Sequence, residues 1–170
     1  GIRDTSVTGV QTCALPIYML HETADVVDVP HFTTVRPSPA AAEMQAMQRL
    51  LQSAERPMVV FGGTGWDAAA CHALRAWVES AHLPAAAAYR CQDRLDNRSS
   101  SYVGDFGLTL NPKLAQRLKE ADVILALGAR LDETTTAGYS LLDVPVPRQK
   151  LIHVHPDANE LGRVYHPTLA

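Results

Sequence analysis

Residues 121–130 read Ala-Asp-Val-Ile-Leu-Ala-Leu-Gly-Ala-Arg and contain the clearest strand signal in the chain. Five consecutive apolar residues, 123–127, follow Asp122 and end at Gly128. A short unbroken apolar run bounded by turn residues is typical of a strand that is buried on both faces, as in a parallel sheet. The sequence therefore predicts a buried strand here, with Arg130 just beyond its carboxyl end.

The same kind of run recurs along the chain, in alternation with segments of helical spacing. Apolar residues at positions 44, 47, 50 and 51 follow the period of a helix, and so do those at 70, 74, 77, 78 and 81. Asn111 and Pro112 form a helix start, because Asn is a good cap and Pro fits the first turn. The predicted strands are residues 58–61, 84–88, 122–127 and 151–155, the predicted helices are residues 40–53, 70–81 and the segment from 111, and a capping-box pattern at 157–160 predicts a final helical turn.

Strands that alternate with helices predict an α/β domain of Rossmann-like, doubly wound type, with a mainly parallel sheet flanked by helices. Ligands of such folds lie beyond the carboxyl ends of the strands. The candidate site is therefore formed by the four loops at residues 62–65, 89–93, 128–135 and 155–157.

Composition and charge restrict the possible partners. The formal net charge is −3 and no block of Lys or Arg is present, which argues against a nucleic-acid partner. No apolar run approaches the roughly 20 residues of a membrane span, so no membrane association is expected. The cysteines at positions 13, 71 and 91 lack the spacing of metal or redox motifs, and a reducing cytoplasm is the expected compartment.

The glycine-rich turn at residues 62–65 is the first candidate for ligand binding. Gly63-x-Gly65-x-x-Ala68 fits a relaxed dinucleotide fingerprint, in which glycines let a phosphate approach the N-terminus of a helix. The acidic residue that this fingerprint places about 20 positions later is missing. The alternative is a tight turn that binds no ligand.

Other polar residues at the strand ends also have two interpretations each. Arg130 could pair with a phosphate or with a carboxylate, such as Asp132 or Glu133. The three threonines in the following loop could bind a ligand, but local backbone hydrogen bonds are more common for such residues. His153 and His155 face one side of a strand, where ordinary hydrogen bonds are favoured over a metal site. No nucleophile is paired with a base, so the residues indicate a binding domain without catalytic or metal-ligating residues.

Five motifs occur in a fixed order along the chain. They are RPMVVFGGTG (56–65), LPAAAAY (83–89), YVGDFG (102–107), ADVILALGAR (121–130) and HVHPDANELG (153–162). Together they resemble the central domain of thiamine diphosphate-dependent, acetolactate synthase-like enzymes, in a match that covers residues 22–170. The resemblance implies a three-domain, homo-oligomeric parent that uses thiamine diphosphate and magnesium to decarboxylate a 2-keto acid and transfer the product, with branched-chain amino acid biosynthesis as one candidate pathway.

The resemblance also implies that this chain is an inactive fragment of that parent. In the family, the first domain activates thiamine through a glutamate, and the last holds the diphosphate and magnesium through a Gly-Asp-Gly…Asn motif. Gly104-Asp105-Phe106-Gly107 is not that motif. The alternatives are a self-standing FAD- or ADP-binding module, and a structural domain whose nucleotide site is empty.

The central domain binds FAD in some members of the family, ADP in others and no nucleotide in the rest. The chain departs from the flavin-binding pattern at residues 132–137 and at the end of the last strand, where a histidine stands in place of an acid. The positions that match the flavin-contacting loops, and are the expected cofactor-binding residues, are Gly62, Gly63, Tyr89, Phe106, Gly128, Arg130 and His155.

The N-terminal residues are expected to lie outside this domain. Residues 7–17, VTGVQTCALPI, resemble the translation of a sequencing adapter, so residues 1–17 are interpreted as an unstructured artefact. Residues 18–39 contain three prolines and are interpreted as the tail of a preceding domain with its linker. The central domain is expected over residues 40–170.

Overall fold

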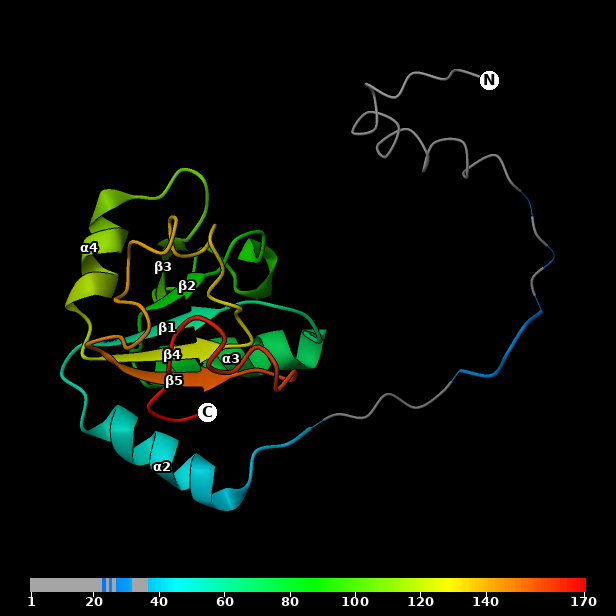
Figure 1. Cartoon of the computed structure of the whole chain (residues 1–170), viewed down its shortest axis with the longest axis horizontal. Coiled ribbons are helices and arrows are strands. Elements are labelled where there is room, and N and C mark those ends of the chain that lie inside the picture. Colours follow the sequence, from blue (N-terminus) through cyan, green and yellow to red (C-terminus); the bar gives the residue numbers. More distant parts are fainter. Residues whose placement is uncertain (1–22, 24, 26, 32–36) are drawn as a thin grey trace. The chain divides into compact units, whose positions relative to one another are not determined.

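The computed structural model describes residues 23, 25, 27–31 and 37–170 (Figure 1). The chain divides into two units, Gly1–Val35 and Arg36–Ala170. The few described residues of the first unit form no helix or strand. The segment that resembles an adapter lies outside the described residues, as does much of the expected linker, so both interpretations stay predictions.

Five parallel strands form one sheet in the second unit. In chain order they are β1 (Pro57–Phe61), β2 (Ala85–Ala87), β3 (Tyr102–Asp105), β4 (Val123–Leu127) and β5 (Lys150–Val154). In space they run β3-β2-β1-β4-β5. All five residues of β4 are paired with both β1 and β5, so the strand predicted from the apolar run at 123–127 has a neighbour on each side. This parallel sheet with flanking helices confirms the predicted α/β, Rossmann-like, doubly wound fold.

In the described region the sheet is flanked by the α-helices α2 (Ala41–Gln52), α3 (Ala68–Ser80) and α4 (Pro112–Glu120). Figure 1 shows α2 and α4 on opposite sides of the sheet. The Asn111 side chain accepts a hydrogen bond from the Lys113 amide at 2.9 Å, which confirms the predicted start of α4. None of the described helices is long and apolar enough to cross a membrane.

The core lies around the central strands, and β1 and β2 show how it is built. The last four residues of β1 are at most 1% exposed, and the three alanines of β2 are completely buried. Alanine has little preference for strands, so the neighbouring ladders decide the conformation. The Val59 amide donates to the Pro84 carbonyl at 2.9 Å, and the Ala85 amide donates to the Ser101 carbonyl at 2.8 Å. The strand predicted at 84–88 is thereby confirmed.

Two elements differ from the expectation. The strand β3 is not expected, because it is a short edge strand whose residues are only half-buried and lack a clear period. The helical turn predicted at 157–160 is wrong, since residues 158–162 form turns. There the Asp157 carboxylate accepts a hydrogen bond from the Asn159 amide, and the Glu160 carboxylate accepts one from Arg163 instead of capping backwards.

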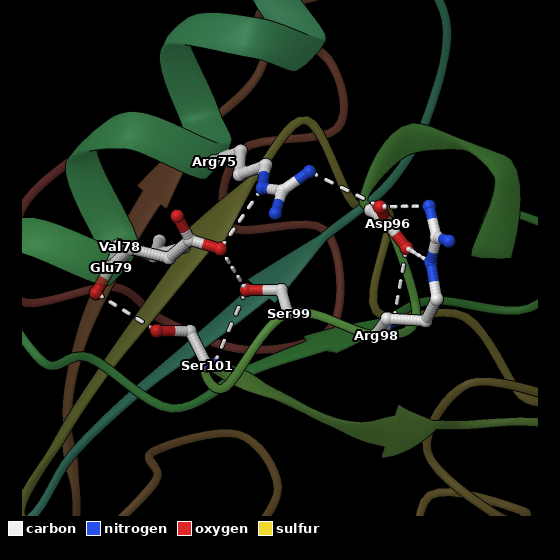
Figure 2. A network of polar contacts seen from close by, with 7 residues as sticks. All are labelled: Arg75, Val78, Glu79, Asp96, Arg98, Ser99 and Ser101. Atoms are coloured by element: carbon white, nitrogen blue, oxygen red, sulfur yellow. Dashed lines mark hydrogen bonds and ion pairs between the residues drawn. The ribbon is translucent and has the colours of Figure 1, made fainter.

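A side-chain network fastens the loop between β2 and β3 to helix α3 (Figure 2). Arg75 on α3 forms ion pairs with Glu79 at 2.9 Å and with Asp96 at 3.1 Å. The Ser99 hydroxyl donates a hydrogen bond to Glu79 at 2.7 Å, and Arg98 donates to Asp96 at 3.0 Å. The network thus holds the polar segment that leads into β3.

The same contacts favour the charged forms of both carboxyl groups. The hydrogen bond from Ser99 lowers the pKa of Glu79, and the hydrogen bond from the Arg98 side chain lowers the pKa of Asp96. A carboxyl group whose pKa is lower in the folded than in the unfolded state stabilises the fold above its unfolded pKa. That stabilisation is lost as the pH falls through the folded pKa.

We therefore expect the network to make stability fall in acid. Between about pH 5 and about pH 3, the free energy of unfolding should fall more steeply for the wild type than for Asp96→Asn, which lacks one titrating partner. Urea unfolding followed by circular dichroism at several pH values measures both slopes. The control Asp143→Asn removes an exposed carboxylate outside the network and so accounts for the loss of one negative charge. Equal slopes for Asp96→Asn and the wild type would contradict this role.

Candidate functional site

The predicted site loops meet at the carboxyl edge of the sheet, where backbone hydrogen bonds join each strand end to the next. The Gly62 amide donates to the last carbonyl of β4 at 3.0 Å, and the Gly128 amide donates to the last carbonyl of β5 at 2.7 Å. On the other side, the Ala88 amide donates to the last carbonyl of β1 at 2.7 Å. The edge is therefore bonded across by the chain's own backbone.

Two of the predicted glycines are required by the close approach of the turns after β1 and β4. Gly63 has a φ of +76° and Gly128 a φ of +72°, a region that other residues rarely adopt. A Cβ on Gly63 would stand 2.0 Å from the Gly128 carbonyl oxygen, and a Cβ on Gly128 would stand 2.5 Å from the Gly62 carbonyl oxygen. Both glycines therefore have a structural reason that involves no phosphate, as the tight-turn alternative requires.

Two residues that the sequence analysis did not single out follow directly after the glycine turn. The Trp66 indole nitrogen donates a hydrogen bond to the Gly62 carbonyl oxygen at 2.7 Å. Asp67 is the N-cap of α3, and its carboxylate accepts a hydrogen bond from the Ala70 amide at 2.8 Å. An Asp in front of a helical stripe is a recognisable cap signal. Nothing in the sequence indicates the orientation of the Trp66 ring.

The structure gives Arg130 a carboxylate partner that is distant in sequence. Its Nε atom lies 3.8 Å from the Oε1 atom of Glu160, which Arg163 also contacts at 3.0 Å. The Glu160 side chain is 9% exposed, whereas the Arg130 side chain is 60% exposed. Arg130 thus forms an ion pair with a carboxylate, as one of its two interpretations predicts. The partner is Glu160, which is further along the chain than Asp132 or Glu133.

The histidines at the end of β5 make ordinary hydrogen bonds, as expected. The Nε2 atom of His153 lies 2.8 Å from the Ala129 carbonyl oxygen, which can only accept, so this nitrogen carries the proton. Burial lowers the pKa of His153 and so favours the neutral ring. The Nδ1 atom of His155 accepts a hydrogen bond from the Asp157 amide at 3.1 Å. Within residues 37–170 and the few described before them, no three His, Cys, Asp or Glu residues gather as metal ligands.

The remaining predicted positions divide between the surface and the core. Tyr89 is half-buried, and the guanidinium carbon of Arg90 lies 5.1 Å from its ring centroid. Phe106 is completely buried, so its side chain belongs to the core and only its amide bonds at the edge, to the last carbonyl of β2 at 2.8 Å. The Thr136 hydroxyl donates to the Asp132 carbonyl at 2.7 Å, the local bond expected for a threonine in this loop.

The polar groups described at this edge thus bond mainly to the backbone or to one another. Two hollows of the described region lie elsewhere. One, lined by Pro57, Pro84 and other residues, is at the amino ends of β1 and β2, and the other, lined by Met47, Trp77 and others, lies between α2 and α3. Fold and edge together define a Rossmann-like, doubly wound α/β domain whose described strand-end groups bond mainly within the chain itself.

Comparison with known proteins identifies the particular family. The model of the thiamine pyrophosphate enzyme central domain matches residues 44–170, so the chain belongs to that family. This finding agrees with the resemblance drawn from the five motifs.

Several curated relatives are similar to this chain. The acetolactate synthase large subunit of Parasynechococcus marenigrum is 29% identical over 125 residues, which are 74% of this chain and 20% of that protein. Isozyme 2 of the acetolactate synthase large subunit of Escherichia coli is 27% identical over 137 residues, 79% and 24% of the two chains. The sulfoacetaldehyde acetyltransferase of Castellaniella defragrans is 29% identical over 124 residues, 73% and 21%. The chain spans only 20% to 24% of the length of these relatives.

The close approach of the two turns leads to a prediction about the glycines. Gly63→Ala should lower the free energy of unfolding by at least about 3 kcal/mol, because the new Cβ adds a clash to the strain of a positive φ. Gly65→Ala is the matched control, since Gly65 also has a positive φ, of +85°, but no atom within 4 Å of the added Cβ. It should cost only about 1–2 kcal/mol. Urea unfolding measures both values, and equal losses would show that the turns do not touch as described.

Proposed function

We propose that this chain is the central domain of a thiamine diphosphate-dependent enzyme of the acetolactate synthase type. The parent decarboxylates pyruvate or a similar 2-keto acid and joins the resulting carbanion to an acceptor. The observation that carries the proposal is the family match over residues 44–170, and it is supported by relatives named as acetolactate synthases and sulfoacetaldehyde acetyltransferases. Thiamine diphosphate, when bound, supplies the electron sink for the decarboxylation.

The described residues of this chain do not fit thiamine diphosphate or its magnesium ion. Gly104 and Asp105 lie on the edge strand β3 rather than in a turn at a helix N-terminus, where backbone amides could hold a diphosphate. The described part also gathers no three His, Cys, Asp or Glu residues that could hold a metal. We therefore assign both groups to other parts of the parent and expect the 170-residue chain to be inactive by itself.

The proposed role of the domain within the parent is to hold the catalytic parts in place. Its buried parallel sheet, covered by helices, supports such a role, and so do strand-end polar groups that are already bonded within the chain. By extension from the family, the parent is a cytoplasmic homo-oligomer, and branched-chain amino acid biosynthesis is its proposed pathway. A domain without a bound nucleotide is compatible with this role, whereas a self-standing FAD- or ADP-binding module receives less support from the geometry of the edge.

The longer reading frame that contains this chain provides the test. Its product should consume pyruvate and form acetolactate only when thiamine diphosphate and magnesium are added, while the 170-residue chain alone should be inactive. A parallel assay with sulfoacetaldehyde tests for the activity after which the acetyltransferase relative is named. Turnover of pyruvate by the 170-residue chain, or by the longer protein without added or bound thiamine diphosphate, would sink the proposal.

A further inference from the structure

A doubly wound sheet has a crevice at the point where its strand order reverses. From β1 the chain passes through α3 to β2 on one side, and β4 lies on the other side of β1. Nucleotides bind to such folds at this reversal, with their phosphates on the glycine turn and the helix N-terminus.

Two backbone amides beside the crevice already have partners within the chain. The Gly62 amide bonds to the last carbonyl of β4, and the Gly128 amide bonds to the last carbonyl of β5. A phosphate bound at a glycine turn accepts hydrogen bonds from amides of this kind. Binding a phosphate to either of these two amides would break a bond that joins neighbouring strand ends.

The two turns also leave no gap between them. The space beside the Gly63 Cα is filled by the Gly128 carbonyl, which lies 2.0 Å from the position of a Cβ. A ligand is larger than one carbon atom, so it could pass between these turns only if they moved apart. Here the glycines allow the backbone to approach backbone, whereas in a nucleotide site they allow it to approach a pyrophosphate.

The indole nitrogen of Trp66 lies next to both turns. Its indole nitrogen donates to the Gly62 carbonyl oxygen at 2.7 Å and lies 3.6 Å from the position of a Cβ on Gly128. Trp66 is half-buried in this position, although it belongs to the loop before α3. The indole nitrogen is thus held against the turns and satisfies one of their carbonyl groups.

The N-terminus of α3 carries a negative charge of its own. The Asp67 carboxylate accepts a hydrogen bond from the Ala70 amide at 2.8 Å, which uses an amide and the positive end of the helix dipole. A phosphate placed there would meet a like charge, which disfavours its binding. Arg130, the cation nearest in sequence to the β4 turn, lies 3.8 Å from Glu160.

We infer that this domain fills its own nucleotide crevice, with the Trp66 ring in the place of a ligand and the Asp67 carboxylate in the place of a phosphate. Neither FAD nor ADP fits the residues of this edge. This inference concerns the central domain alone and does not depend on which reaction the parent performs.

Nucleotide titrations of the 170-residue chain test the inference directly. Trp77→Phe leaves Trp66 as the only tryptophan, so its emission reports on the crevice. We expect no change in Trp66 emission and no saturable heat with FAD or ADP, which corresponds to a Kd above about 1 mM. A micromolar Kd for either nucleotide would overturn the inference, whether or not Trp66 emission changes with it. An FAD-binding protein titrated in parallel verifies that binding is detectable.

Amide hydrogen exchange and acrylamide quenching test the positions of Asp67 and Trp66 without any nucleotide. Asp67→Ala should speed exchange of the Ala70 amide several-fold, whereas Asp67→Ser should keep it slow, because Ser also caps a helix. In the Trp77→Phe background, acrylamide should quench Trp66 more slowly than a free indole, since its ring is packed on the turns. Equal exchange in both Asp67 variants, or quenching of Trp66 as fast as a free indole, would show that these side chains do not occupy the crevice.

Discussion

The contact between the turns after β1 and β4 holds the carboxyl edge of the sheet together. These turns follow adjacent strands at the centre of the sheet, and each places a glycine against a carbonyl group of the other. Because the turns meet, the hydrogen bonds of the sheet continue past the last paired residues of β1 and β4. The carboxyl edge, which in this fold class is the usual place for a ligand, thereby becomes part of the core's support.

The electrostatics of the edge are consistent with this closed arrangement. Two charged groups near the strand ends have partners within the chain, Asp67 at the first turn of α3 and Arg130 at Glu160. Buried or half-buried polar groups are costly unless they are bonded, so such an edge is stable without a ligand. A domain of this kind needs no change of state between a loaded and an empty form.

Much of the fold follows from the sequence, because its signals are local. The apolar run of β4 and the Asn111-Pro112 start of α4 are each determined by a few adjacent residues, and both are found as predicted. The edge strand β3 escaped prediction because its pairing with β2 comes from tertiary contacts. The partners of the site residues also escaped prediction because they come from tertiary contacts. Arg130 and Glu160 are 30 positions apart in the chain. The indole of Trp66 bonds to a backbone carbonyl group, which leaves no signal in the sequence.

The strand β2 shows how such packing limits change in the chain itself. Its three alanines are completely buried between neighbouring strands and the layers above and below them. Any larger side chain would have to displace close-packed atoms, at a cost of typically about 1–3 kcal/mol, and glycine would weaken the strand. Both larger residues and glycine are therefore disfavoured at these three positions. Among proteins that carry this domain, residues on the outer faces of the helices can vary freely. The sequence of β2 should change far more slowly.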